Sequence, residues 1–338
     1  MENKRPLLVL LFIFALLCLG LGAHLMQKGL PFAPVAASCL SLFMVLFLYS
    51  ICGVGDFLGL LKKKVEKTPP LTLCLPLPLI ISYLVYLLSF QGSLGAKQFI
   101  VLLYYFTPFL LLYLYKKARG PLAPRLTLMD SLLFFLVWLP VEFGLLKGGW
   151  DFPLGQGGAA FINSSATILV ATVFIPARGL TGVHFTFRVQ KKDIKPMLSN
   201  LNLATLAIVP VGLFAGFFEW HPSLFSPSMF IATFFGMLLL VALPEELLFR
   251  GILWNFLQKT LPSRHAAAFI ACSIFALSHA NNPSFPKGET PDYQFILFSG
   301  ICGFFYGRTW MQTKSLLPAA IVHSLMNTFW LQFLQKQT

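Results

Sequence analysis

The sequence predicts an all-α, polytopic transmembrane helical bundle, and two observations lead to this fold class. First, 57% of the 338 residues are hydrophobic and only 11% are charged, whereas soluble domains carry about 25% charged residues. Second, apolar runs recur along the whole chain, and a helix of roughly 20 apolar residues crosses a hydrocarbon core of about 30 Å. Because a helix satisfies its own backbone hydrogen bonds, a bundle of helices is the expected architecture in lipid.

About eleven apolar segments are predicted as membrane spans, so we expect a multi-pass protein of the cell membrane. A cytoplasmic N-terminus puts 20 of the 25 lysines and arginines on the cytoplasmic side, which agrees with the preference of positively charged short loops for that side. The spans lie approximately at 7–26, 34–52, 71–90, 99–115, 128–146, 159–177, 201–218, 229–249, 266–280, 295–310 and 316–334.

The distribution of polar residues divides the chain into two predicted regions. Residues 1–200 form an N-terminal transmembrane region of about six spans, and residues 201–338 form a membrane-embedded region that holds the polar motifs. In the first region Glu142 follows Pro140, and we interpret it as a structural partner for a polar group. The net charge of +13 comes from short clusters between spans, so no nucleic-acid partner is predicted. The six cysteines form no CxxC pair, which argues against a thiolate metal site or a disulfide framework.

Ionisable residues gather at the end of the eighth predicted span, directly after Pro244, which lacks a backbone N–H and is expected to disturb the preceding turn. An ionisable side chain at the centre of a membrane helix costs about 2.5 to 3.5 kcal/mol on insertion scales, so its presence indicates a task or a partner. Glu246 and Arg250 are four residues apart and share a helix face, which predicts an ion pair. Glu245 lies about 100° around the helix and remains the freer carboxylate, suited to act as a general base on water. The alternative is a helix end whose charges are solvated at the cytoplasmic surface.

Three further polar residues occur in the later predicted spans. His279 lies near the end of the ninth span, and His323 and Asn327 share a face of the eleventh. Each alone is typical of a structural hydrogen bond between helices. Together with the glutamates they indicate one polar site built from several helices. Neutral imidazoles and a carboxylate are ligands of catalytic zinc, whereas in a metal-free site His323 and Asn327 would donate hydrogen bonds to an oxyanion.

The motifs EExxxR (Glu245, Glu246, Arg250), FxxxH (Phe275, His279) and HxxxN (His323, Asn327) occur in this order on three apolar spans. This arrangement resembles the CPBP family of intramembrane proteases, also called the Abi or CAAX-protease family, over about residues 229–333. The resemblance implies that Glu245 activates water with help from Glu246, that Arg250 holds Glu246, and that Asn327 stabilises the oxyanion. It further implies that His279 and His323 are catalytic or, if zinc is used, bind the metal together with Glu245.

The function predicted from these residues is an intramembrane endopeptidase. It would hydrolyse a peptide bond of a membrane-associated protein or lipidated peptide in contact with membrane lipid, by a metalloprotease or a glutamate-based mechanism. One alternative is a non-catalytic membrane protein that keeps the scaffold as an immunity or regulatory partner. The other is a transporter, in which the glutamates and histidines would form a proton or ion path.

Overall fold

The chain folds into helices joined by turns and loops, and no β-strand occurs among the described residues, which confirms the predicted all-α class. Contacts divide the chain into two compact units, Met1–Thr181 and Gly182–Thr338, which we call unit 1 and unit 2. The division predicted between residues 200 and 201 stays a prediction. The computed structural model describes residues 5–54, 56–89, 95–150, 158–221, 225–281 and 292–334.

Within the described residues, six helical stretches are long and apolar enough to cross a membrane, which supports a multi-pass protein. Two shorter apolar helices, Leu11–Gln27 and Arg264–Leu277, overlap the first and ninth predicted spans. The count of eleven spans stays a prediction. The six stretches are Phe32–Cys52, Pro69–Leu87, Ala96–Arg119, Gly158–Ala177, Lys191–Phe214 and Pro227–Thr260.

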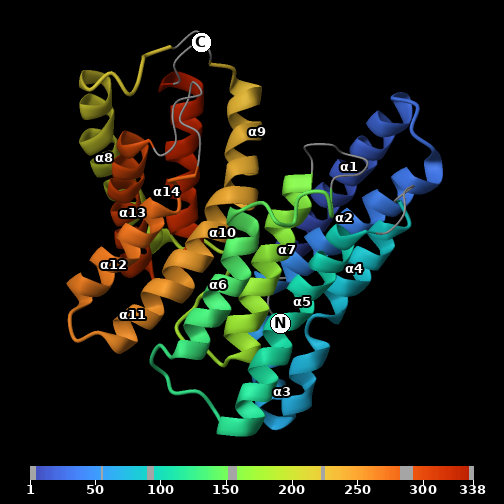
Figure 1. Ribbon diagram of the computed structural model, residues 1–338. Coiled ribbons are helices and arrows are strands. Elements are labelled where there is room, and N and C mark those ends of the chain that lie inside the picture. Colours follow the sequence, from blue (N-terminus) through green and yellow to red (C-terminus); the bar gives the residue numbers. More distant parts are fainter. Residues whose placement is uncertain are drawn as a thin grey trace. The chain divides into compact units, whose positions relative to one another are not determined.

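Unit 1 contains the helices drawn from blue to green in Figure 1. Within it α2 packs against α1, α4 and α7. The residues that α2 buries, such as Val35, Leu42, Val45 and Tyr49, recur at the spacing of one helix face. The elements are α1 (Arg5–Gln27), α2 (Phe32–Cys52), α3 (Phe57–Lys67), the 3₁₀ helix η1 (Pro69–Cys74), α4 (Leu77–Leu87), α5 (Ala96–Arg119), α6 (Leu128–Glu142), α7 (Gly158–Thr172) and the π-helical turn η3 (Val173–Ala177).

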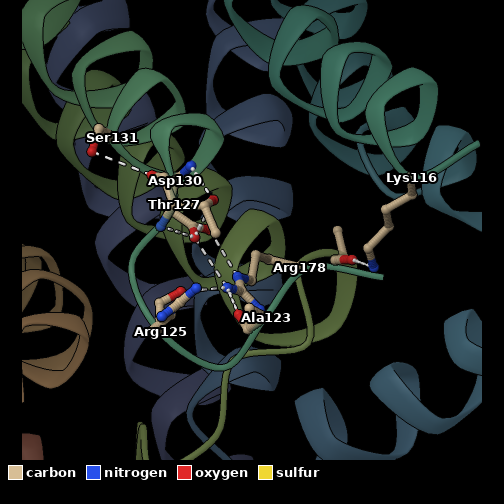
Figure 2. Close-up of polar contacts among 8 residues, drawn as sticks. Lys116, Ala123, Arg125, Thr127, Asp130, Ser131 and Arg178 are labelled. Atoms are coloured by element: carbon tan, nitrogen blue, oxygen red, sulfur yellow. Dashed lines mark hydrogen bonds and ion pairs between the residues drawn. The ribbon is translucent and has the colours of Figure 1, made fainter. Parts of the chain in front are cut away.

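A buried ion pair fixes the connection between α5 and α6 in unit 1 (Figure 2). Arg178 Nε donates to Asp130 Oδ1 at 2.7 Å, and Nη2 donates to Asp130 Oδ2 at 3.0 Å and to the carbonyl oxygen of Ala123 at 2.5 Å. Asp130 also forms a capping box with Thr127, whose backbone N–H donates to Oδ2 at 2.9 Å. The Asp130 carboxylate therefore caps the start of α6. It also binds Arg178, at the end of η3, by two parallel hydrogen bonds.

Glu142, at the end of α6, accepts a hydrogen bond from the indole Nε1 of Trp138 at 3.2 Å. This contact agrees with the prediction that Glu142 is a structural partner for a polar group. The two side chains are four residues apart on the same helix, so they share a face.

Unit 2 holds all six predicted site residues and is built from α8 to α14 (Figure 1). In it α13 packs against α8, α12 and α14. The elements are α8 (Lys191–Phe214), α9 (Pro227–Met237), the π-helical turn η5 (Leu238–Ala242), α10 (Leu243–Glu246), the π-helical segment η6 (Leu247–Trp254), α11 (Asn255–Thr260), α12 (Arg264–Leu277), α13 (Tyr293–Thr313), α14 (Leu316–Phe329) and the π-helical turn η7 (Trp330–Leu334).

The glutamate pair lies on one continuous helical stretch, Pro227–Thr260, whose winding changes around Pro244. Proline has no N–H to donate to the turn before it and its ring crowds that turn. The preceding turn, η5, has π geometry, and η6 after the glutamates is also π-helical. Such insertions are frequent at functional sites because they re-aim side chains. The predicted disturbance beside the carboxylates is confirmed.

Two glycines let α13 approach its neighbours closely. A Cβ atom at Gly303 would lie 2.7 Å from the Phe275 ring and 3.0 Å from Arg250 Nη2. At Gly307 a Cβ atom would overlap the ring of Trp254. The GxxxG spacing of Gly303 and Gly307 therefore serves close helix packing.

Candidate active site

Four of the six predicted site residues line one cavity of unit 2. The cavity has a volume of about 350 Å³, and Glu245, His279, His323 and Asn327 all contribute to its wall. They come from α10, from the turn directly after α12, and from α14. The rest of the wall is mainly aromatic and aliphatic, with Phe217, Phe218, Phe275, Phe295, Phe298, Tyr306, Phe329 and Trp330 among its side chains.

The other two residues, Glu246 and Arg250, are fully buried and form an ion pair. Arg250 Nη1 lies 3.1 Å from Glu246 Oε1, with the two side chains 1% and 0% exposed. Arg250 Nη2 donates to the carbonyl oxygen of Gly303 at 2.8 Å. The predicted ion pair is confirmed, and the alternative of solvated charges at a helix end is wrong. Burial of both charges is compatible with folding because each has a close partner.

His323 joins both glutamates. Its Nδ1 lies 3.0 Å from Glu246 Oε1, and because a carboxylate only accepts, Nδ1 carries the hydrogen. Its Nε2 faces Glu245 Oε2 at 3.8 Å. This distance is longer than a direct hydrogen bond. Glu246 therefore sets the orientation of the imidazole and directs Nε2 toward Glu245.

The two neighbouring glutamates have different surroundings. Glu246 is fully buried, whereas the Glu245 side chain is 30% exposed and lines the cavity. Glu245 Oε2 is a buried atom that makes no hydrogen bond within the described part of the chain. Since successive residues differ by about 100° around a helix, one carboxylate reaches the cavity and the other the buried arginine.

His279 is held by the backbone of its own helix. Its Nδ1 lies 2.9 Å from the carbonyl oxygen of Phe275, four residues earlier. A carbonyl oxygen only accepts, so Nδ1 is the donor and Nε2 of the neutral ring can accept a hydrogen bond. The FxxxH spacing thus fixes the orientation of the histidine at the cavity wall.

Two aromatic rings pack around the charged centre. Tyr306 stacks on the imidazole of His323 with ring centroids 4.3 Å apart and planes 15° from parallel. The guanidinium carbon of Arg250 lies 4.1 Å from the centroid of Phe275 and 5.7 Å from that of Tyr306. Phe275 is part of the FxxxH motif, whereas Tyr306 was not among the residues predicted from the sequence. Its only sequence signal is its place between Gly303 and Gly307, on the face of α13 that approaches the site.

Comparison with known families gives one match. The family described as Rce1-like, Type II CAAX prenyl endopeptidase Rce1-like, matches residues 227–329. This region is an Rce1-like domain. No curated protein and no solved structure matches the chain.

The Rce1-like domain contains all six predicted site residues, from Glu245 to Asn327. The family match supports the resemblance to CAAX proteases and, with the apolar helices, an intramembrane protease. It covers most of unit 2 and none of unit 1. The family match by itself assigns no chemical role to an individual residue.

The Rce1-like site offers no grouped set of metal ligands. Among the residues that the structure describes, no three His, Cys, Asp or Glu side chains lie together as a group that could hold a metal ion. The set predicted for zinc was Glu245, His279 and His323. A structural or catalytic zinc needs at least three protein ligands at about 2.0 to 2.3 Å. The predicted zinc site therefore stays a prediction.

Proposed function

We propose that this chain is an intramembrane endopeptidase in which Glu245 activates the attacking water molecule. The proposal rests on one observation: a carboxylate, two imidazoles and an amide line a single cavity that is otherwise mainly apolar. Besides these four side chains, the mainly aromatic and aliphatic wall contains the hydroxyl groups of Ser299 and Tyr306. The Rce1-like match over residues 227–329 supports the same reaction class.

The first step is removal of a proton from water. The Glu245 side chain is 30% exposed and lines the cavity, so its carboxylate can accept the proton of a water molecule bound beside it. The unprotonated Nε2 of His279, on the same cavity wall, can accept the second hydrogen and orient the water. The water oxygen then attacks the carbonyl carbon of the scissile peptide bond, and the proton stays on Glu245.

The second step is stabilisation of the negative oxygen that forms on the substrate. Asn327 can donate from its amide, and His323 can donate from Nε2 when the ring is protonated. Because Nδ1 of His323 donates to Glu246 at 3.0 Å, the ring is already oriented for this task. Collapse of the intermediate breaks the C–N bond, and Glu245 returns its proton to the leaving amine nitrogen.

Glu246 and Arg250 act as positioning residues in this scheme. Neither lines the cavity, and both are buried. Glu246 orients His323, and Arg250 balances the charge of Glu246. This arrangement parallels the carboxylate and histidine pairs of hydrolases, in which the acid holds the imidazole in one tautomer.

The substrate that fits this site is a membrane protein or a lipidated peptide. The mainly aromatic and aliphatic wall accommodates apolar groups, and the apolar helices of the chain support a substrate that is in contact with lipid. The expected location is the cell membrane, with the N-terminus in the cytoplasm as the distribution of basic residues predicts.

The deciding experiment compares membrane peptides from cells that produce wild-type protein, Glu245→Gln or Glu142→Gln. Glu142 is the matched control because it is a half-buried helix carboxylate that lies in unit 1. We expect Glu245→Gln alone to abolish a defined set of cleavage products and to cause uncleaved precursors to accumulate. Identical peptide profiles for wild type and Glu245→Gln would reject the hydrolase and favour a non-catalytic membrane protein.

A further inference from the structure

The helix α3 in unit 1 has an unusual exposed face. Phe57 is 40% and Leu60 is 56% exposed, while Leu58 and Val65 on the opposite face are buried against the unit. Further along the exposed face, Lys63, Lys64 and Lys67 are also exposed. The face is therefore apolar in its first half and basic in its second.

These residues form a hollow on the surface of unit 1. The hollow has a volume of about 320 Å³ and is lined only by α3, through Phe57, Leu60, Leu61, Lys63, Lys64 and Lys67. We call it the α3 hollow. Its apolar and basic walls lie side by side, which suits a ligand that has a hydrocarbon part next to an anionic part.

The charge of the α3 hollow is not balanced by nearby acids. Lys62 pairs with Glu66 at 3.8 Å, and Lys116 of α5 donates to the carbonyl oxygen of Ala177 at 2.5 Å. In the described part of the chain, by contrast, no acidic side chain forms an ion pair with the three lysines of the hollow. Their positive charge remains available to an anionic partner.

The position of α3 in the chain restricts what that partner is. The helix lies between two candidate membrane spans, Phe32–Cys52 and Pro69–Leu87, so it lies where the chain leaves and re-enters the membrane. A helix at this depth meets both acyl chains and headgroups, and basic residues there attract anionic lipid. Exposed Phe57 and Leu60 are unfavourable in water but favourable against acyl chains.

We propose that the α3 hollow binds an anionic phospholipid. The phosphate and its negative charge lie between Lys63, Lys64 and Lys67, and an acyl chain lies against Phe57, Leu60 and Leu61. This site is separate from the cavity of unit 2, and it does not depend on the proposed peptidase activity. An acidic peptide would satisfy the lysines but would leave the apolar half of the hollow unused.

The test is a lipid titration of the purified full-length chain in a neutral detergent, with bound lipid counted by native mass spectrometry. The probes are phosphatidylglycerol and phosphatidylcholine with identical acyl chains. We expect phosphatidylglycerol to bind at least tenfold more tightly. At about fivefold per lysine, Lys63→Gln/Lys64→Gln/Lys67→Gln should weaken its binding on the order of 100-fold at low ionic strength.

Two matched variants distinguish a specific lipid-binding site from nonspecific electrostatic attraction between the protein and anionic lipid. Lys191→Gln/Lys192→Gln/Lys195→Gln removes the same charge from exposed positions at the start of α8 and should change affinity less than threefold. The charge-retaining Lys63→Arg/Lys64→Arg/Lys67→Arg should bind nearly as wild type, which excludes misfolding as the cause of any loss. Leu60→Gln should weaken both lipids severalfold.

Three results would overturn the proposal. Equal binding of the two lipids would remove the role of headgroup charge. Equal losses of phosphatidylglycerol affinity in the triple glutamine variants of α3 and α8 would mean that only the net charge of the protein determines binding. Binding of a polyglutamate peptide to the α3 lysines, with no preference for phosphatidylglycerol, would identify an acidic protein as the partner instead.

Discussion

Replacement of Arg250 by alanine tests how the charged centre of unit 2 is held together. The guanidinium contacts Glu246 Oε1 at 3.1 Å, the carbonyl oxygen of Gly303 at 2.8 Å and the ring of Phe275 at 4.1 Å from its centroid. Arg250→Ala removes all three contacts and leaves Glu246, which is 0% exposed, without its cation. His323 alone would then face the buried carboxylate.

The expected loss in the free energy of unfolding follows from these contacts. Loss of one partner of a buried ion pair costs about 3 to 5 kcal/mol, because the remaining charge is left uncompensated. The hydrogen bond to Gly303 and the cation–π contact with Phe275 would each add about 1 to 2 kcal/mol if they were independent. They share one guanidinium and are not additive, so we expect a total loss near 5 kcal/mol, most of it electrostatic.

The assay is equilibrium unfolding in mixed micelles, followed by tryptophan fluorescence. The matched variant is the double substitution Arg250→Met/Glu246→Gln, which removes both charges but leaves an amide oxygen at position 246 that can accept from His323. We expect the double variant to recover about 2 to 3 kcal/mol relative to Arg250→Ala. A loss below about 1 kcal/mol for Arg250→Ala, or no recovery in the double variant, would refute the reasoning.

The contacts described above lead to four other predictions. Glu245→Gln should lower substrate cleavage about 10²- to 10⁴-fold with an unchanged unfolding midpoint, and full turnover would remove this residue from the mechanism. Tyr306→Phe should keep the stack on His323 and near wild-type kcat, whereas Tyr306→Leu should lower kcat about fivefold to tenfold and alter the pH–rate profile; equal effects of the two variants would contradict a role for the ring. Asp130→Ala should destabilise unit 1 by about 3 to 5 kcal/mol, because it removes the carboxylate that accepts two hydrogen bonds from the buried Arg178 guanidinium; limited protease digestion of the full chain can measure this loss. Cleavage should survive strong chelators, and inhibition together with one zinc ion per chain in metal analysis would replace the metal-free mechanism.

Local periodicity explains what could be predicted of the site. Glu246 and Arg250 lie four residues apart on a helix, so their pairing follows from 3.6 residues per turn, and the structure confirms it at 3.1 Å. The same periodicity predicts that His323 and Asn327 share a face, and both line the cavity. Pro244 signalled a disturbed turn, because a missing N–H has a local effect wherever the helix lies.

Contacts between distant segments could not be predicted from one sequence. The hydrogen bond between His323 and Glu246 joins positions 77 apart, and no local pattern specifies it. Tyr306 is one of nine tyrosines in a chain that is 15% aromatic, so composition does not single it out as the residue that stacks on His323. Likewise, the bond between Asp130 and Arg178 depends on how α6 and η3 pack in unit 1. The helix boundaries also differ from the predicted spans, since hydropathy alone does not mark where helices begin and end.

The two adjacent glutamates differ in their burial and in their interaction partners. Glu246 is fully buried and interacts with both Arg250 and His323, so its negative charge is balanced inside the protein. Glu245 lines the cavity, is 30% exposed and lies 3.8 Å from His323, so in the proposed mechanism it exchanges a proton with water. Adjacent positions on a helix are the simplest way to aim two carboxylates about 100° apart. Exchange of the two environments would require rotation of the whole helix, which the buried ion pair with Arg250 opposes. In the proposed mechanism the pair therefore provides one structural and one chemical carboxylate, and the charged core of unit 2 determines which is which.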